Sequence, residues 1–243
     1  MDGLTVRSAP VLTNDEVAPG VFHLTVCGSF PAKPAQFYML RAWELDPLLA
    51  RPMSVFERTE EQISFLYEVR GRGTELLSRL KSRDVLSLFG PLGNGWERSP
   101  GRVALIGGGC GIAPLLQTAK TFREVDLYLG FREKPFLVEA FDQAAIQLVV
   151  TSETGDGARK GVVTDGFDPV DYEACYACGP HGMLKTLAQI CNTARVPLFV
   201  SLEERMACGI GACLGCAVKT TNGVRRVCLD GPVFRAAEMI WDV

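Results

Sequence analysis

Four cysteines near the end of the chain have the types and spacing of iron–sulfur ligands. Cys208, Cys213 and Cys216 follow the pattern C-x4-C-x2-C, and Cys228 comes after a short segment with a turn at Asn222-Gly223. Three clustered thiolates and one more distant thiolate are the ligand pattern of a plant-type 2Fe-2S cluster, whose irons are held by soft sulfur donors. A structural zinc site would more naturally use two separated C-x2-C pairs. Zinc, or free redox-sensing thiols, are the alternatives that the spacing leaves open.

Glycines between these cysteines would allow the loop to curl around a cluster. Gly209, Gly211 and Gly215 stand between the ligands, where glycine can take positive φ and bring backbone N–H groups close to sulfur. Because an iron–sulfur cluster moves single electrons, we expect the rest of the chain to hold whatever donates or accepts them.

Composition narrows the class of protein. With 243 residues, of which 47% are hydrophobic, the chain can form two compact domains and a small appendage. Its net charge of -3 and dispersed basic residues argue against a nucleic-acid partner. Residues 1–10 hold no apolar export signal, and the most apolar stretch, 103–116, is interrupted by Gly and Pro and too short to span a bilayer. We therefore expect a cytoplasmic protein without a membrane span.

In that compartment the other five cysteines should stay reduced, and a buried apolar thiol is the default interpretation of each. They are Cys27, Cys110, Cys175, Cys178 and Cys191.

The first hundred residues have the pattern of short antiparallel strands separated by turn signals. This spacing predicts a small antiparallel barrel. The expected strands are 21–26, 37–40, 63–69 and 85–89. Thr74 is a candidate cap for a helix that would carry Leu76, Leu77 and Leu80.

Two segments of this barrel could bind an anion. Arg51-Pro52-Met53-Ser54 places a fixed-charge guanidinium next to a hydroxyl at the start of a strand, which suits a phosphate and the edge of a flavin ring. Gly71-Arg72-Gly73-Thr74 opens the helix, so its free N–H groups and dipole favour an anion. Each motif also occurs in purely structural roles, so neither identifies a site alone.

The middle of the chain predicts a doubly wound α/β domain. Val103 to Ile106 is an apolar run typical of a buried parallel strand, and a glycine-rich turn from Gly107 to Pro114 leads into a helix that ends near Phe122. A strand, such a turn and a helix form a cradle for a dinucleotide pyrophosphate. Further strands are expected at 125–130, 146–151 and 174–178, with helices at 137–143 and 183–194.

The order of these motifs resembles that of the ferredoxin-NADP reductase superfamily. The C-terminal segment S-L-E-E-R-M-A-C-G-I-G-A-C, followed after Cys228 by Asp230-Gly231-Pro232-Val233-Phe234, resembles one branch of it, the electron-transfer subunits of NAD-linked dihydroorotate dehydrogenase. The resemblance covers essentially the whole chain. It implies an FAD-binding antiparallel β-barrel domain at 1–99, an NAD-binding doubly wound α/β domain at 100–198, and a small C-terminal 2Fe-2S domain at 199–243.

The resemblance also implies roles for individual residues. The FAD diphosphate and ring would be held by Arg51, Pro52, Met53 and Ser54, the flavin would be lined by Tyr67, Glu68 and Val69, and its phosphates would meet Gly73 and Thr74. The nicotinamide nucleotide would meet Gly107, Gly108, Gly109 and Gly111, and would be covered by Cys178, Gly179 and Pro180. Four metal ligands complete the set, Cys208, Cys213, Cys216 and Cys228.

On this resemblance, electrons pass from the FMN of a catalytic dihydroorotate dehydrogenase subunit through the 2Fe-2S cluster and FAD to NAD, in a heterotetramer of two copies of each chain. Glu153, after the strand at 146–151, favours NAD over NADP, although Arg159 and Lys160 lie nearby in the sequence. A flavin and iron–sulfur subunit of another NAD(P)H-linked oxidoreductase, serving ferredoxin, sulfide or polysulfide, is the alternative function. A zinc-bearing interaction module is the alternative from another class.

Overall fold

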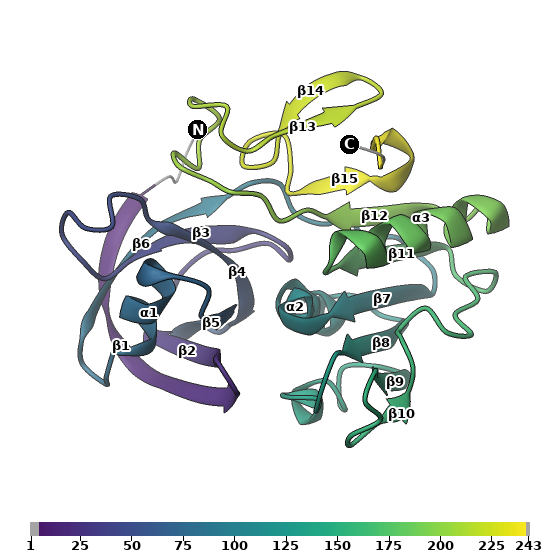
Figure 1. Ribbon diagram of the computed structural model, residues 1–243, viewed down its shortest axis with the longest axis horizontal. Coiled ribbons are helices and arrows are strands. Elements are labelled where there is room, and N and C mark those ends of the chain that lie inside the picture. The colour runs from purple at the N-terminus through teal and green to yellow at the C-terminus, as the bar shows by residue number, and fades with distance from the viewer. Residues whose placement is uncertain (1–4, 242–243) are drawn as a thin grey trace.

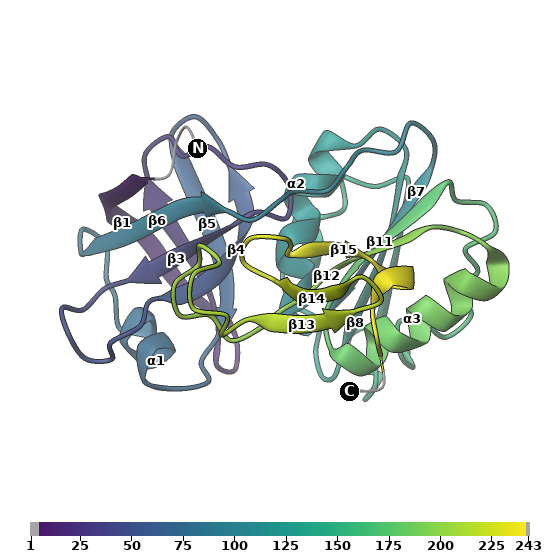
Figure 2. The same cartoon turned by 90° about the horizontal axis from the view of Figure 1, so that it is seen from above.

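The computed structural model describes residues 5–241 as a closed barrel, a seven-stranded sheet and a C-terminal segment that runs across both (Figures 1 and 2). The three parts confirm the predicted fold class. The last strand of the C-terminal segment joins the seven-stranded sheet.

The barrel has the strand order β1-β2-β5-β4-β3-β6, with antiparallel pairing throughout. Its elements are β1 (Thr5–Ala18), β2 (Val21–Cys27), β3 (Phe37–Arg41), β4 (Arg51–Arg58), β5 (Gln62–Glu68), β6 (Val85–Leu92) and helix α1 (Arg72–Ser78). In β5, Phe65 and Tyr67 point into the barrel core whereas Leu66 packs outward, as strand geometry requires. The strand β1 was not predicted, because most of its residues are exposed and no long alternation marks it.

Helix α1 begins at Arg72, two residues before the predicted cap. Thr74 therefore lies inside the first turn, where its hydroxyl accepts hydrogen bonds from the N–H groups of Arg70 and Gly71 at 2.9 and 3.2 Å. Thr74 therefore caps the helix from within its first turn, because its hydroxyl bonds to backbone N–H groups that precede the helix.

The seven-stranded sheet has the order β10-β9-β8-β7-β11-β12-β15, and every pair is parallel except β12 with β15. Its elements are β7 (Val103–Gly108), η1 (Gly109–Ile112), α2 (Ala113–Thr121), β8 (Val125–Phe131), η2 (Val138–Ala140), β9 (Gln147–Ser152), β10 (Arg159–Lys160), β11 (Ala174–Cys178), α3 (His181–Ala194) and β12 (Leu198–Ser201). Leu105 in β7 packs with α2 on one face, and Ile106 packs with α3 on the other. Helices on both faces define a doubly wound sheet.

The helix predicted at 137–143 is wrong. Only a single 3-10 turn, η2, forms there, because Leu137 takes a left-handed conformation with φ of 55° at the point where a helix would begin.

Helix α2 joins the barrel to the sheet. It packs on β4, where the Arg58 N–H donates to Gln117 Oε1 at 3.1 Å and Lys120 forms an ion pair with Glu57. Phe56 of the barrel belongs to the same apolar core as Leu115 of the helix. Helix α2, which follows the glycine-rich turn, is thereby held against the barrel, and Figure 1 shows it between the barrel and the sheet.

The C-terminal segment lies across the barrel and the sheet (Figure 2). It contains the hairpin β13 (Ala217–Thr220) and β14 (Gly223–Arg226), then β15 (Val233–Arg235) and η3 (Ala236–Glu238). The hairpin turn falls within one residue of the predicted Asn222-Gly223. In residues 5–241 no helix has both the length and the apolar character needed to cross a membrane.

A buried ionic network lies at the start of β8. The glycine-rich turn, which follows β7, lies at the opposite end of these parallel strands. Asp126 is 0% exposed. Its Oδ2 accepts from Arg102 Nη2 at 2.6 Å and from the Tyr172 hydroxyl at 2.7 Å, and Tyr172 also bonds to Tyr128. A buried carboxylate of this kind is stable only while its partners remain.

Asp126→Ala should lower the free energy of unfolding by about 2–3 kcal/mol, below the range for a fully buried pair because the Arg102 side chain is 39% exposed. Urea unfolding followed by fluorescence measures the loss. Glu124→Ala is the matched control, because this exposed carboxylate lies two residues away, outside the network. Equal losses in the two variants would show that the network does not stabilise the sheet.

Candidate functional site

Three of the four predicted cluster ligands lie in one loop, and the fourth, Cys228, lies on the segment that follows the β13–β14 hairpin. Cys213 is exposed, Cys208 is half-buried, and Cys216 and Cys228 are buried. Backbone N–H groups point at each sulfur, from Ile210 to Cys208 at 3.4 Å, Gly211 to Cys228 at 3.1 Å, Gly215 to Cys213 at 3.4 Å and Cys228 to Cys216 at 3.4 Å. Such donors favour thiolate over thiol, as cluster binding requires.

The thiols are arranged as two pairs. Cys208 and Cys213 lie within hydrogen-bonding reach of each other, and so do Cys216 and Cys228. Across residues 5–241, no three His, Cys, Asp or Glu side chains surround one point that could hold a single metal ion. Two adjacent thiol pairs fit a cluster of two irons, in which four cysteines are shared between the metals. The donor chemistry therefore fits the cluster.

The pKa values of two of the predicted cluster thiols are shifted in opposite directions. Burial raises the pKa of Cys208, but N–H groups of the loop and the Cys213 thiol outweigh burial and lower it to about 6. Burial, together with the neighbouring Cys216 thiol, raises the pKa of Cys228 to about 12 despite the Gly211 N–H. Metal binding at Cys228 would therefore displace a proton.

The loop takes its curvature from two of the three predicted glycines. Gly209 and Gly211 have φ of 71° and 79°, as expected. Gly215 does not take positive φ, and its neighbour Leu214 does so instead, with φ of 58°. Gly215 still supplies its N–H to Cys213, so its predicted closeness to sulfur is confirmed.

The cluster loop packs directly on the barrel. A Cβ at Gly209 would lie 3.0 Å from Leu92 Cδ1 and 3.1 Å from Met39 Cγ, and the φ of 71° already favours glycine at this close approach. Met39, in β3, is paired with Pro52 of the predicted flavin segment in β4. One strand therefore connects the cluster loop to that segment.

The predicted FAD segment forms the first half of β4. Arg51, Pro52, Met53 and Ser54 are all half-buried, unlike the two buried residues that follow. The guanidinium of Arg51 lies against Gly73 in α1, where any Cβ would clash with it, and above the ring of Trp43 at 5.5 Å. A cation held against the first turn of a helix, with its free N–H groups, fits a diphosphate.

The remaining predicted flavin residues differ in accessibility. Glu68 is exposed and Val69 is half-buried. Tyr67 is 2% exposed in the barrel core, and its hydroxyl donates to Asn14 Oδ1 at 3.0 Å, so only its backbone can line a ligand outside the barrel. The Thr74 hydroxyl is engaged in capping α1, which leaves its backbone N–H for a phosphate.

The predicted nucleotide loops meet at the switch point of the sheet. From β7 the chain proceeds outward to β8 and β9, then returns to place β11 on the other side of β7. Gly111 packs so closely on the backbone of Cys178 and Gly179 that a Cβ would clash, and a Cβ at Gly108 would lie 2.8 Å from Pro180 Cδ. Ligands of doubly wound sheets bind at such points, so the cradle fits a dinucleotide.

Gly107 has a different role from the rest of that loop. It is buried at the end of β7, and a Cβ there would lie 2.7 Å from Leu115 Cδ1. Its contact is therefore with α2, whereas Gly109 has φ of 55° and open space around it.

Three residues beside these loops were missed as site residues. Arg70 and Glu203 act electrostatically on the thiol of Cys110, whose pKa burial raises to about 12. Burial likewise raises the pKa of Glu203, against the effect of Arg70, although part of its side chain is open to solvent. Of the three, Glu203 could have been found from the sequence, because it belongs to the S-L-E-E-R-M motif.

The prediction that the five cysteines outside the cluster are buried is wrong for Cys27. Cys27 is exposed at the end of β2, whereas Cys175, Cys178 and Cys191 are buried and Cys110 is half-buried. The Cys178 thiol has a pKa well above its ordinary value because of burial, so it meets the nucleotide loop as a neutral group.

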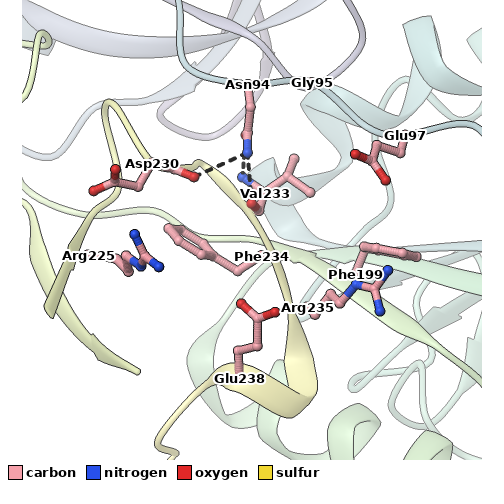
Figure 3. Close-up of a pocket in the computed structure, with 10 residues that line it drawn as sticks. All are labelled: Asn94, Gly95, Glu97, Phe199, Arg225, Asp230, Val233, Phe234, Arg235 and Glu238. Atoms are coloured by element: carbon pink, nitrogen blue, oxygen red, sulfur yellow. Dashed lines mark hydrogen bonds between the residues drawn. The ribbon is translucent and has the colours of Figure 1, made fainter. Parts of the chain in front are cut away.

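A pocket of about 350 Å³ lies away from the predicted residues (Figure 3). The linker between β6 and β7, the strands β12 and β15 and the C-terminal hairpin surround it. Its lining is Asn94, Gly95, Glu97, Phe199, Arg225, Asp230, Val233, Phe234, Arg235 and Glu238. None of these residues is a predicted ligand, and the mixed charges define no ligand class.

Comparison with known proteins supports the assignment of the loop and of the whole chain. Residues 203–240 match the family model described as the iron-sulfur cluster binding domain of dihydroorotate dehydrogenase B. The chain is 44% identical to the dihydroorotate dehydrogenase B (NAD(+)) electron transfer subunit of Clostridium acetobutylicum, over 95% of each chain. It is 45% identical to the subunit of the same name from Caldanaerobacter subterraneus subsp. tengcongensis, over 96% of this chain and 98% of the relative.

One solved structure also resembles the entire chain. A chain from the structure of an NADH-dependent reduced ferredoxin-NADP oxidoreductase superposes with a TM-score of 0.87 and 31% identity. The match covers 100% of this chain and 92% of the other.

Cys213→Ser or Cys216→Ser should remove or destabilise the cluster while FAD stays bound, because the β4 and α1 contacts do not involve these thiols. Iron analysis and the visible spectrum of the purified variants measure the effect. Cys27→Ser is the matched control, an exposed cysteine outside the loop. Unaltered iron content in the Cys213 and Cys216 variants would contradict the ligand assignment.

The end of β9 predicts a preference for NAD. Glu153 is exposed there, although β10 pairs Arg159 with Thr151 and Lys160 with Ser152 and so brings two cations close. We expect NADH to exceed NADPH in kcat/KM by about tenfold or more, equivalent to about 1.4 kcal/mol. Dye reduction with each nucleotide measures the ratio. Glu153→Gln should narrow it, and comparable turnover of the two nucleotides by the unmodified chain would contradict the prediction.

Proposed function

The chain belongs to the family of dihydroorotate dehydrogenase B (NAD(+)) electron transfer subunits, and on this premise we propose that it links a dihydroorotate-oxidising partner to NAD in pyrimidine biosynthesis. It is an oxidoreductase subunit with FAD, a 2Fe-2S cluster and NAD as its cofactors. Its proposed direction of transfer runs from the partner's FMN to the cluster, then to FAD and NAD.

One observation carries this proposal. The cluster loop, the flavin segment and the nucleotide loops lie on neighbouring elements. Met39 contacts Gly209 in the cluster loop and pairs with Pro52 in the flavin segment. The turn η1, within the glycine-rich segment, contacts β5 of the barrel. Three redox sites on neighbouring elements would suit a relay, whereas a zinc interaction module would need only the first.

The chain's own residues divide the work of holding these groups. When bound, the cluster supplies one-electron transfer, and FAD exchanges single electrons for a hydride. Arg51 provides a permanent charge for a diphosphate, and the absence of a Cβ at Gly73 leaves room for its guanidinium beside the first turn of α1. The half-buried Pro52, Met53 and Ser54 continue along β4 and would border the flavin ring.

The nucleotide loops position the second substrate against the barrel. Gly108, Gly109 and Gly111 let the backbone approach a pyrophosphate, and Gly179, with φ of 151°, lets Cys178 and Pro180 close over the nicotinamide. Because burial keeps Cys178 neutral, no thiolate charge opposes hydride transfer at that position.

Exposed apolar residues around the cluster support a protein partner. Ile210, Leu214 and Leu229 are 46%, 61% and 49% exposed next to the exposed Cys213. Local packing, the other expectation for Ile210 and Leu214, does not cover them. We propose that this face receives the FMN-containing catalytic subunit, in a heterotetramer of two copies of each chain. None of the nine cysteines forms a disulfide, which supports the proposed cytoplasmic location.

The structural match to a ferredoxin-NADP oxidoreductase chain favours one second candidate function. In that case the same three sites would serve an assembly that uses ferredoxin. The partner therefore distinguishes the two functions, because the chain's own sites would be the same in both.

The isolated chain should reduce dyes with NADH but should not reduce NAD with dihydroorotate. None of the three parts that residues 5–241 form is a β/α barrel of about 250 residues, the kind of domain that would hold FMN and dihydroorotate. Dihydroorotate-dependent NADH formation should appear only when the catalytic subunit is added, as absorbance of NADH measures.

Two outcomes would change the assignment. Dihydroorotate oxidation by the homogeneous chain would contradict the subunit role. Dye reduction that no dihydroorotate dehydrogenase partner affects, together with coupling to ferredoxin, would favour the second candidate. A colourless, zinc-containing protein would contradict both.

A further inference from the structure

Arg226 joins the two ends of the cluster segment. It lies at the end of β14, two residues before Cys228, and is half-buried. Its Nη1 donates to the Gly211 carbonyl at 3.2 Å, and its Nε and Nη2 donate to the two carboxylate oxygens of Asp230 at 3.1 and 3.3 Å. The Arg226 N–H also donates to Asp230 Oδ2 at 2.8 Å. One side chain thus ties the C-x4-C-x2-C loop to the segment that carries the fourth ligand.

Both backbone polar groups of Gly211 form hydrogen bonds. Its carbonyl accepts from Arg226, and its own N–H donates to Cys228 Sγ at 3.1 Å, the shortest of the four N–H to sulfur distances described above. Gly211 is buried and has φ of 79°, so its two peptide groups are fixed in orientation. Arg226 therefore holds the residue that supplies a hydrogen bond to a ligand sulfur.

Asp230 is anchored independently of Arg226. Its carbonyl accepts from Asn94 Nδ2 at 3.2 Å, and Asn94 also exchanges hydrogen bonds with the backbone of Val233 at 3.0 and 2.9 Å. Figure 3 shows Asn94 reaching from the linker to this segment, with the Asp230 carboxylate pointing away from it. The carboxylate is thus presented to Arg226 by a segment that the linker already fixes.

We propose that Arg226 and Asp230 form a pair of opposite charges that positions Gly211 and sets the reduction potential of the cluster. Arg226 is a positioning residue, because it acts through Gly211 and through its charge rather than by ligating iron. The inference rests on the proposed cluster at these cysteines.

The charges of Arg226 and Asp230 should shift the reduction potential of the cluster in opposite directions. A reduced 2Fe-2S cluster carries one more negative charge than the oxidised cluster, so a nearby cation favours reduction and a nearby anion opposes it. Hydrogen bonds to the ligand sulfurs also favour the reduced state. Removing Arg226 loses both a cation and the support of Gly211, whereas Asp230→Asn loses only an anion and keeps an oxygen that can accept from Arg226.

The test is a redox titration of the cluster in the loaded protein, followed by electron paramagnetic resonance, with visible circular dichroism to report its environment. Arg226→Gln should shift the midpoint potential downward, and Asp230→Asn should shift it upward. Arg226→Lys, which keeps the positive charge, should have a midpoint potential close to that of the unmodified protein. Lys219→Gln is the matched control, an exposed cation on the same hairpin, and should leave the potential unchanged.

The outcomes separate this inference from the proposed function. If the unmodified chain holds no 2Fe-2S cluster, the proposed function fails first. If the cluster is present and both charge variants leave its potential unchanged, or shift it in the same direction, the inference is overturned. If Arg226→Gln fails to retain the cluster, the Arg226→Lys and Asp230→Asn titrations still decide, because a purely structural role predicts no upward shift in Asp230→Asn.

Discussion

The position of the cluster loop depends on one constraint, which is that the C-terminal segment must be fixed to two domains at once. Its beginning follows β12, and its end returns as β15 to pair with the same strand. Between these anchors, Gly209 packs on the barrel, where Met39 and Leu92 belong to one apolar core with the buried cysteines Cys216 and Cys228, two of the predicted ligands. Cluster ligation and domain packing are therefore parts of the same structure.

That constraint would keep the three predicted cofactor sites on elements that pack together. The apolar core that contains the buried ligands extends through β3 and β6 of the barrel to the α3 face of the sheet. A second core joins α2 to the outer surface of β4 and β5. The flavin segment lies between these two packed interfaces, so neither neighbour can move away without exposing apolar surface to water.

Much of this arrangement could be predicted from local patterns. The four cysteines, the apolar strand at Val103 and the glycine-rich turn each carry their chemistry in a short stretch of sequence. The strand β1 could not be found because its partners, not its own residues, define it, and the helix expected at 137–143 fails at the backbone of Leu137. The roles of Arg226 and Asn94 depend on contacts made only after folding, with Gly211 and with Val233.

The order of electron transfer through the chain is the central claim, and rapid mixing of the loaded protein with NADH under anaerobic conditions tests it most directly. Because η1 of the glycine-rich turn contacts β5, the strand that carries the predicted flavin residues Tyr67 and Glu68, while the cluster loop packs on Met39 of β3, the flavin absorbance should bleach first and the cluster absorbance should follow. Cluster bleaching that precedes flavin bleaching, or occurs without it, would contradict the account.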